Sequence, residues 1–294
     1  MIGIGFGETD GGPVRRCGTG EVLLDRREAG PLLAVERLAT GARIETWLVW
    51  SARGWHPAVL KLARPHQRYN PRVLRSLRRE VAALTTRHPA LPRLVADGTV
   101  SSEPYVLVEY VDGPDLAEAI DDTGPMDPVD AALLGAHLLP ALADLHRRGL
   151  AHLDVKPENV VLRDGRPVLV DFGSSRRIGS PQPAGRPVGT IGYAAPELEA
   201  CDPVSAAMDL YGLGTVLAES LTGEPFPDGV QLPDTPLTGL AARLLSESPK
   251  DRGETADILT ELAACAGDRR PWPAWADDYG SRSTSSARSV RVPV

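Results

Sequence analysis

Short runs of apolar residues at strand-like spacing fill the first third of this 294-residue chain. Five runs have this character: 31–38 (PLLAVERL), 45–51 (ETWLVWS), 57–63 (PAVLKLA), 93–100 (RLVADGTV) and 104–111 (PYVLVEYV). Because the first three follow one another closely, they predict an antiparallel meander. Residues 1–30 show no sustained period, so we expect a flexible leader there, with one short strand at 21–25 (EVLLD).

A helix is predicted over residues 70–88, between the third and fourth runs. It opens on Asn-Pro, a favourable N-cap followed by a residue that suits the first helical position. Val73, Leu77 and Leu84 recur at helical spacing, and Glu80 lies on the same stripe. A carboxylate on a buried stripe needs a cationic partner, because an unpaired buried charge is costly. The alternative is that Glu80 is one more solvated charge in an Arg-rich helix.

From residue 112 the pattern becomes mainly helical. Helices are predicted at 131–145, 205–221, 238–247 and 255–265. One hairpin signal interrupts them, Asp164-Gly165 between two apolar runs. Residues 265–294 are rich in Arg, Pro, Ser and Asp and predict a disordered tail. We therefore predict an α+β fold with a small β-rich half, 31–111, and a larger helical half, 112–264.

Charge and cysteine usage narrow the possible functions. The net charge of −7 argues against binding to nucleic acid or to an anionic membrane, both of which favour a basic surface. Cys17, Cys201 and Cys265 form no CxxC pair, which suits a reducing compartment without a disulfide framework or zinc site. No signal peptide is evident, and no apolar run is long enough to cross a bilayer; the best, 131–145, is interpreted as a core helix. We expect a cytoplasmic protein.

The candidate chemistry is concentrated in "HLDVKPEN", residues 152–159, directly after a predicted helix. Asp171 follows in "VLVDFG", where it ends an apolar strand. Asn159 and Asp171 thus stand at neighbouring strand ends of one hairpin, and their oxygens could share a hard cation such as Mg²⁺. Asp154 and Lys156 alternate around the same turn and could face one cavity.

These motifs together resemble the eukaryotic-type Ser/Thr protein kinase family over roughly residues 31–264. "HLDVKPEN" looks like the catalytic loop, "DFG" like the metal loop, and "GTIGYAAPE" (189–197) like the end of the activation segment. "VLKLA" looks like the strand that bears the nucleotide-binding lysine, Lys61. The resemblance implies a bilobal kinase fold, ATP and Mg²⁺ as cofactors, and a protein substrate.

The family's roles carry over to matching positions. Asp154 would accept the proton of the substrate hydroxyl, and Lys156 would neutralise charge on the transferring phosphoryl group. Asn159 and Asp171 would hold Mg²⁺. Lys61 would contact the α- and β-phosphates and pair with a glutamate, best assigned to Glu80.

Further residues are implied around the nucleotide and the substrate. "VLVEYVDGPDL" resembles the hinge between the lobes, with Val108 behind the adenine and backbone groups of Glu109 and Val111 at its edge; the alternative is a plain edge strand. The ATP-binding set also includes Val59, which is larger than the family's alanine, and Val161. Thr190, ahead of "GYAAPE", occupies the position that contacts the catalytic aspartate.

The family's glycine loop is eroded here. Gly41 lies twenty residues before Lys61, which matches the family's middle glycine, whereas Ala39 and Ile44 take the other two glycine positions. The glycine-rich stretch 3–12 (GIGFGETDGG) is too far from the lysine and is interpreted as part of the leader. We call the turn around Gly41, which the resemblance places over the phosphates, the lid. Since Ile44 is β-branched and disfavours positive φ, we predict a stiffer lid and weaker ATP binding.

Other positions are interpreted as structural residues or as departures from the family's pattern. His152 would brace the catalytic loop, Asp209 would cap its backbone, and Glu197 would pair with Arg252. Leu153 replaces the family's arginine beside the catalytic aspartate, so a phosphate on the activation segment has less charge to organise. We therefore expect activity that does not depend on phosphorylation there.

Three functions remain open from the residues. An active Ser/Thr kinase is favoured because every charged catalytic position is filled. A pseudokinase acting as a nucleotide-binding or scaffold module is the alternative, supported by Ala39, Ile44 and Val59. A small-molecule phosphotransferase ranks last, because such relatives usually lack "APE" and the lysine two residues after the aspartate.

Overall fold

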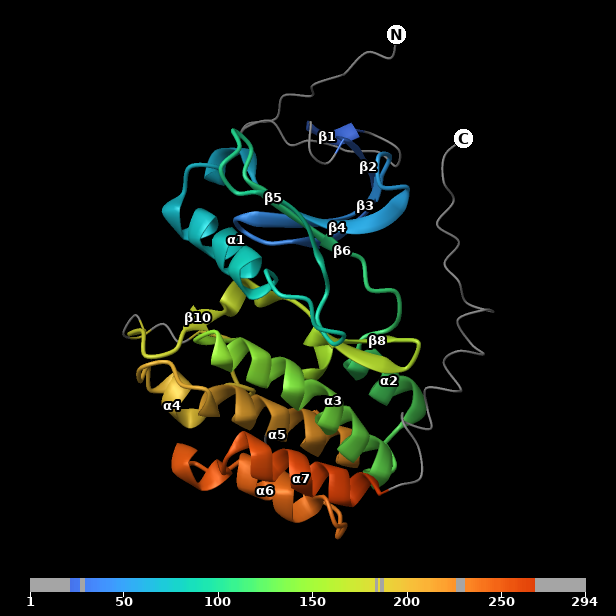
Figure 1. The fold of residues 1–294 in the computed structure, drawn as a ribbon, viewed down its shortest axis with the longest axis vertical. Helices are drawn as coiled ribbons and strands as arrows, with labels where there is room; N and C mark the ends of the chain where they lie inside the picture. Colours follow the sequence, from blue (N-terminus) through green and yellow to red (C-terminus); the bar gives the residue numbers. More distant parts are fainter. Residues whose placement is uncertain (1–21, 27–29, 183–184, 186–187, 226–230, 268–294) are drawn as a thin grey trace. The chain divides into compact units, whose positions relative to one another are not determined.

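The computed structural model describes residues 22–26, 30–182, 185, 188–225 and 231–267 (Figure 1). These residues form two compact units, and the chain passes from the first to the second at Tyr110 and Val111. Residues 86–92 belong to the second unit although they precede the last two strands of the first. The glycine-rich stretch 3–12 and nearly all of the predicted tail lie outside the described residues.

A six-stranded antiparallel sheet dominates the first unit, in the order β1-β2-β3-β4-β6-β5. Its strands are β1 (Val22–Arg26), β2 (Gly30–Thr40), β3 (Ile44–Ser51), β4 (His56–Ala63), β5 (Leu94–Gly98) and β6 (Tyr105–Glu109). The predicted meander is confirmed, and so is the short strand in the leader. Register places Lys61 of β4 between Thr46 and Val106.

A hydrophobic core cluster of this unit comes from alternate residues of the central strands, which share one face of the sheet. Its members share near-complete burial: Leu32, Ala34, Trp47, Val49, Ala58, Leu60, Leu62, Tyr105 and Leu107. Because Leu60 and Leu62 point into this core, the intervening Lys61 points to the opposite face.

Helix α1 (Pro71–Ala83) lies beside the sheet in Figure 1. The Asn70 side chain accepts a hydrogen bond from the Arg72 N–H at 2.9 Å, as the predicted N-cap should. The helix ends at Ala83, however, and not at His88 as predicted. The segment beyond is Thr-Thr-Arg-His-Pro, in which β-branched residues and a following proline both disfavour helix.

The second unit is mainly helical, with α3 packed against α5 and α7. Its helices are α2 (Leu116–Thr123), α3 (Pro128–Arg147), α4 (Pro196–Glu199), α5 (Ala207–Thr222), α6 (Thr238–Leu244) and α7 (Thr255–Ala266). Contrary to the prediction, α3 is long and apolar enough to span a bilayer. Burial of 61% of its most apolar window within the structure nevertheless agrees with a core helix.

Two small strand pairs complete the second unit. Strand β7 (Leu150–Ala151) pairs with β10 (Arg176–Arg177), and β8 (Val160–Arg163) pairs with β9 (Arg166–Leu169). The β8–β9 turn is the predicted Asp164-Gly165, with φ of 47° and 73°. Positive φ at both central residues is the type I′ geometry that such a dipeptide favours. This hairpin fixes the strand ends that carry the candidate cation ligands.

Candidate active site

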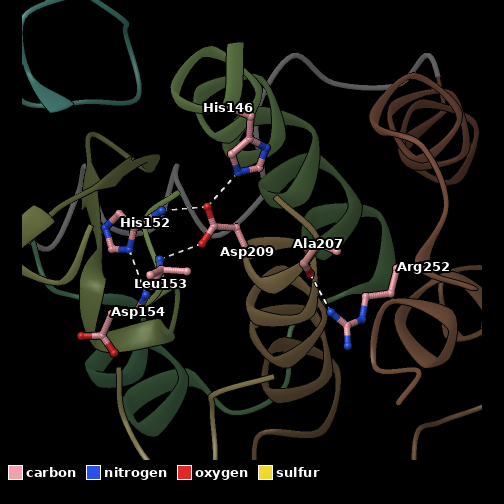
Figure 2. Close-up of polar contacts among 7 residues, drawn as sticks. All are labelled: His146, His152, Leu153, Asp154, Ala207, Asp209 and Arg252. Atoms are coloured by element: carbon pink, nitrogen blue, oxygen red, sulfur yellow. Dashed lines mark hydrogen bonds and ion pairs between the residues drawn. The ribbon is translucent and has the colours of Figure 1, made fainter. Parts of the chain in front are cut away.

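The segment 152–159 leaves β7 as an irregular loop whose first N–H groups are fixed from a distant helix. The Asp209 carboxylate, on α5, accepts hydrogen bonds from the N–H of His152 at 2.8 Å and of Leu153 at 2.7 Å. His146, in the last turn of α3, contacts the same carboxylate at 2.7 Å. Figure 2 shows these groups converging on Asp209. The predicted cap is therefore present, with an additional contact from His146.

The Asp209 carboxylate stabilises an uncommon backbone conformation at Leu153. Leu153 has a φ of 66°, which is costly for a residue other than glycine, of the order of 1–3 kcal/mol. Burial alone would raise the pKa of Asp209, but the hydrogen bond and charge of His146, the charge of His152 and the Leu153 N–H hold that pKa below its usual value. An ionised Asp209 is the stronger acceptor and keeps Leu153 in place.

His152 braces the loop from within. Its fully buried ring lies within hydrogen-bond distance of the Val170 carbonyl (3.1 Å) and of the Asp154 N–H (3.3 Å). The ring also meets Phe172 edge to face, with centroids 4.9 Å apart. Burial lowers the pKa of His152, although Asp209, Asp154 and Asp171 act in the opposite direction. The ring links the loop to the segment that leads to Asp171.

Three predicted site residues come together at Asp154. Thr190 donates to Asp154 Oδ1 at 2.8 Å. The Asn159 amide nitrogen donates to the Asp154 carbonyl at 2.8 Å and lies 3.2 Å from its Oδ2. These contacts orient the Asp154 carboxylate and at the same time turn the amide oxygen of Asn159 away from it.

The donor set at the hairpin ends fits Mg²⁺. Asn159 and Asp171 flank the register pair Val160 and Leu169, and the N–H of Val170 donates to the Asn159 carbonyl at 2.9 Å. Asp171 has a φ of 61° and accepts from the Gly173 N–H at 3.3 Å. Among the described residues no group of three His, Cys, Asp or Glu could hold a metal. One amide and one carboxylate suit an ion that keeps water and phosphate as its remaining ligands.

Lys156 lies in the same loop and is only 17% exposed at its side chain. It contacts Glu158 at 3.9 Å, a distance at the limit of an ion pair. A lysine held this loosely is free to bind an anion when one is present.

In the first unit, the structure pairs Lys61 with Glu80 at 2.7 Å. Their side chains are 12% and 4% exposed. The contact confirms that Glu80 points inward with a cationic partner and is not a solvated surface charge. Since each charge would be costly to bury alone, the pair holds β4 and α1 at a fixed distance.

The turn from β2 to β3 contains Gly41, whose N–H donates to the Ile44 carbonyl at 3.0 Å. Ile44 lies in β3 opposite Ala63 and has regular strand geometry. The turn is therefore a closed hairpin in which Ile44 does not adopt the positive φ open to glycine.

The predicted adenine-binding residues lie at β4, β6 and β8. Val59 and Val108 are register partners in the first unit. Glu109 ends β6, and its N–H donates to the Arg93 carbonyl at 2.8 Å, so this N–H is not available to an adenine edge. Val111 is buried in the second unit, where Val161 is half-buried in β8.

Glu197 and Arg252 form the predicted buried pair. Arg252 is fully buried, and its Nη2 donates to Glu197 Oε2 at 2.7 Å. It also donates to the carbonyl of Ala207 at 2.8 Å, drawn in Figure 2, and to that of Ser246 at 3.0 Å. Sequence reasoning missed these carbonyl contacts and missed His146, whose only signal is its place at a helix end six residues before His152.

Known proteins are similar to this chain in sequence. The protein kinase domain family matches residues 51–256. The chain is 31% identical over 278 residues to a probable serine/threonine-protein kinase, PkwA, of Thermomonospora curvata, covering 87% of this chain and 37% of that protein. It is 37% identical over 218 residues to the serine/threonine-protein kinase PkaA of Streptomyces coelicolor, covering 66% and 40%. PknB of Mycobacterium leprae is 34% identical over 212 residues, covering 69% and 33%.

The chain therefore belongs to the protein kinase family, among the eukaryotic-type Ser/Thr protein kinases of bacteria. It spans between 33% and 40% of the length of these three relatives.

Proposed function

We propose that the protein is a Ser/Thr protein kinase that transfers the γ-phosphoryl group of ATP to a hydroxyl of a protein substrate. The observation that carries this proposal is the orientation of Asp154 by Thr190 and Asn159. A carboxylate held by two donors is preorganised to accept a hydrogen bond from an incoming hydroxyl and to take its proton.

The second unit supplies the other charges that phosphoryl transfer needs. Mg²⁺, held by Asn159 and Asp171, would neutralise phosphate charge when bound. Lys156, whose contact with Glu158 is long at 3.9 Å, would stabilise the charge on the transferring group. Such electrostatic positioning supplies most of the catalysis in this class of reaction.

The first unit supplies nucleotide-binding groups. Lys61, oriented by Glu80, would bind the α- and β-phosphates. Val59 and Val108 would contact adenine, and the carbonyl of Glu109 would accept from its amino group. Gly41 would bring the lid turn toward phosphate, although Ala39 and Ile44 reduce its freedom. We place the reaction in the cytoplasm, where ATP is abundant and free cysteines such as Cys201 and Cys265 persist.

The test is transfer of labelled phosphate from Mg-ATP to a degenerate Ser/Thr peptide library. Asp154→Asn should abolish transfer while retaining ATP binding, because the amide cannot accept the proton. Asp164→Asn is the matched control, since it makes the same chemical change at an exposed turn whose positive φ asparagine tolerates. Equal transfer by Asp154→Asn and the parent would reject the kinase assignment and favour a nucleotide-binding or scaffold role.

A further inference from the structure

We propose that Leu153 is a positioning residue: its apolar packing holds residues 188–198 in the conformation that places Thr190 on Asp154, without phosphorylation of that segment. This inference rests on the proposed kinase function but concerns how its site is kept ordered.

The side chain of Leu153 is only 3% exposed. It belongs to a buried cluster, here called the Leu153 cluster, that joins the catalytic loop to the activation segment and to α5. The buried members are Ala151, Leu153, Ala195, Leu198, Val204 and Met208, with Val188, Ala194 and Tyr211 packed against them. Four of these residues, Val188, Ala194, Ala195 and Leu198, belong to the 188–198 segment, so this segment is tied to the loop by hydrophobic burial.

Backbone geometry at Leu153 adds a second contact with the same segment. A Cβ placed on Gly189 would lie 2.5 Å from the Leu153 carbonyl oxygen, and Gly189 has a φ of 90°. Only glycine allows this approach. The next residue, Thr190, contacts the residue after Leu153, namely Asp154. Two consecutive residues of the catalytic loop thus contact two consecutive residues of the 188–198 segment. A fixed Leu153 therefore also fixes the Thr190 hydroxyl, which orients the Asp154 carboxylate.

Leu153 itself cannot move freely. Its N–H donates to Asp209, and its φ of 66° is held by that bond. The loop side of the contact is therefore rigid, and the segment packs onto a preformed apolar surface. A phosphate could not replace this contact, because the leucine side chain offers no charge or hydrogen bond to it.

The serines earlier in the segment are held by local backbone contacts. Ser180 donates to the Arg177 carbonyl, and Arg176 donates to the carbonyls of Ser174 and Ser175. Ser175 is 1% exposed. The buried Ser175 hydroxyl is therefore not open to a modifying enzyme in this conformation, which agrees with an order that comes from packing.

The first test uses Leu153→Ala and Leu153→Met, with Leu262→Ala as control. Leu262 is also fully buried, in α7, where it contacts Gly135 of α3. We expect Leu153→Ala to lower kcat for peptide transfer by about tenfold or more while leaving KM for ATP unchanged, because a smaller fraction of molecules holds the competent conformation. Leu153→Met should restore the parent value, since methionine keeps the volume. Leu262→Ala should lower stability but leave kcat unchanged below its unfolding temperature.

Hydrogen exchange supplies a readout independent of activity. Leu153→Ala should lose amide protection over 188–198 and keep it in α3 and α7, and Leu262→Ala should do the reverse. This readout holds even if the protein proves not to be a kinase. Unchanged protection over 188–198 in Leu153→Ala, or an equal fall in kcat for Leu262→Ala, would overturn the proposal.

A second measurement addresses phosphorylation directly. Parent protein treated with a phosphatase, and the triple variant Ser174→Ala, Ser175→Ala, Ser180→Ala, should retain the parent kcat. Loss of transfer in both, together with its recovery after rephosphorylation of the parent, would show that phosphate and not Leu153 orders the segment.

Discussion

Arg252 offers a sharp test of the energetics of the second unit, because its bidentate pair with Glu197 can be compared with a second, less buried Arg–Glu pair among the described residues. Arg252 and Glu197 are buried, with side-chain exposures of 0% and 9%. Arg243 and Glu261 have comparable geometry, 3.0 and 2.8 Å, but exposures of 35% and 42%. The same substitution, arginine to methionine, can therefore be compared in two environments.

The expected magnitudes follow from burial. Arg252→Met leaves the Glu197 carboxylate without its partner in a low-dielectric site, which costs about 3–5 kcal/mol. It also removes donors from the carbonyls of Ser246 and Ala207, each worth about 1–3 kcal/mol if no water replaces them. Arg243→Met removes an exposed pair and should cost about 0.2–1 kcal/mol.

The measurement is urea unfolding followed by circular dichroism, with free energies from linear extrapolation. Adding Glu197→Gln to Arg252→Met completes a double-mutant cycle. The double variant should be less destabilised than the sum of the single variants, by about 0.5–3 kcal/mol, since the uncompensated charge is gone. Comparable losses for Arg252→Met and Arg243→Met, or additive behaviour in the cycle, would refute the assignment of a buried, mutually dependent pair.

Three further outcomes are expected. Thr190→Val removes a hydrogen bond to a charged group and should lower kcat by about tenfold to a hundredfold, with Thr190→Ser close to the parent; unchanged kcat would contradict the role of that contact. Stability should fall as the pH drops below about 6.5, because burial lowers the pKa of His152, so the unfolded chain takes up a proton before the folded one does. The lowered pKa of Asp209 adds a further loss in more acidic solution. Unfolding free energies that are flat from about pH 8 to about pH 5 would refute this. Ile44→Gly should tighten ATP binding in a calorimetric titration, since the lid turn gains backbone freedom; equal affinity and turnover would reject the account of a stiffened lid.

Local patterns in the sequence were sufficient to predict most of the elements. Alternation predicted the strands of the first unit, and the Asn-Pro start of α1 forms the expected cap. The inward position of Glu80 followed from its place on an apolar stripe, because burial of a charge requires a partner. Each of these predictions depends on residues that are near one another in the chain or on one electrostatic rule.

What the sequence could not predict depends on distant partners. His146 and Asp209 are 63 positions apart, and nothing in either neighbourhood indicates the other. The predicted end of α1 was wrong by five residues. Helical periodicity continues past the point where Thr85 and the downstream Pro89 stop the helix. The left-handed conformation of Leu153 had no local signal, since leucine itself disfavours it and the stabilising contact comes from Asp209, 56 positions away.

The β8–β9 hairpin has a consequence for the order in which the site assembles during folding. Asn159 and Asp171, at its two ends, are separated by only twelve positions, and it closes on a turn with strong local preference. Both predicted cation ligands are therefore brought together by contacts of low sequence separation. The cap of Asp209 on His152 bridges 57 positions and the Thr190 contact bridges 36. Because loop-closure entropy delays the longer contacts, the cation-binding half of the site should form early in folding and the base-orienting half late.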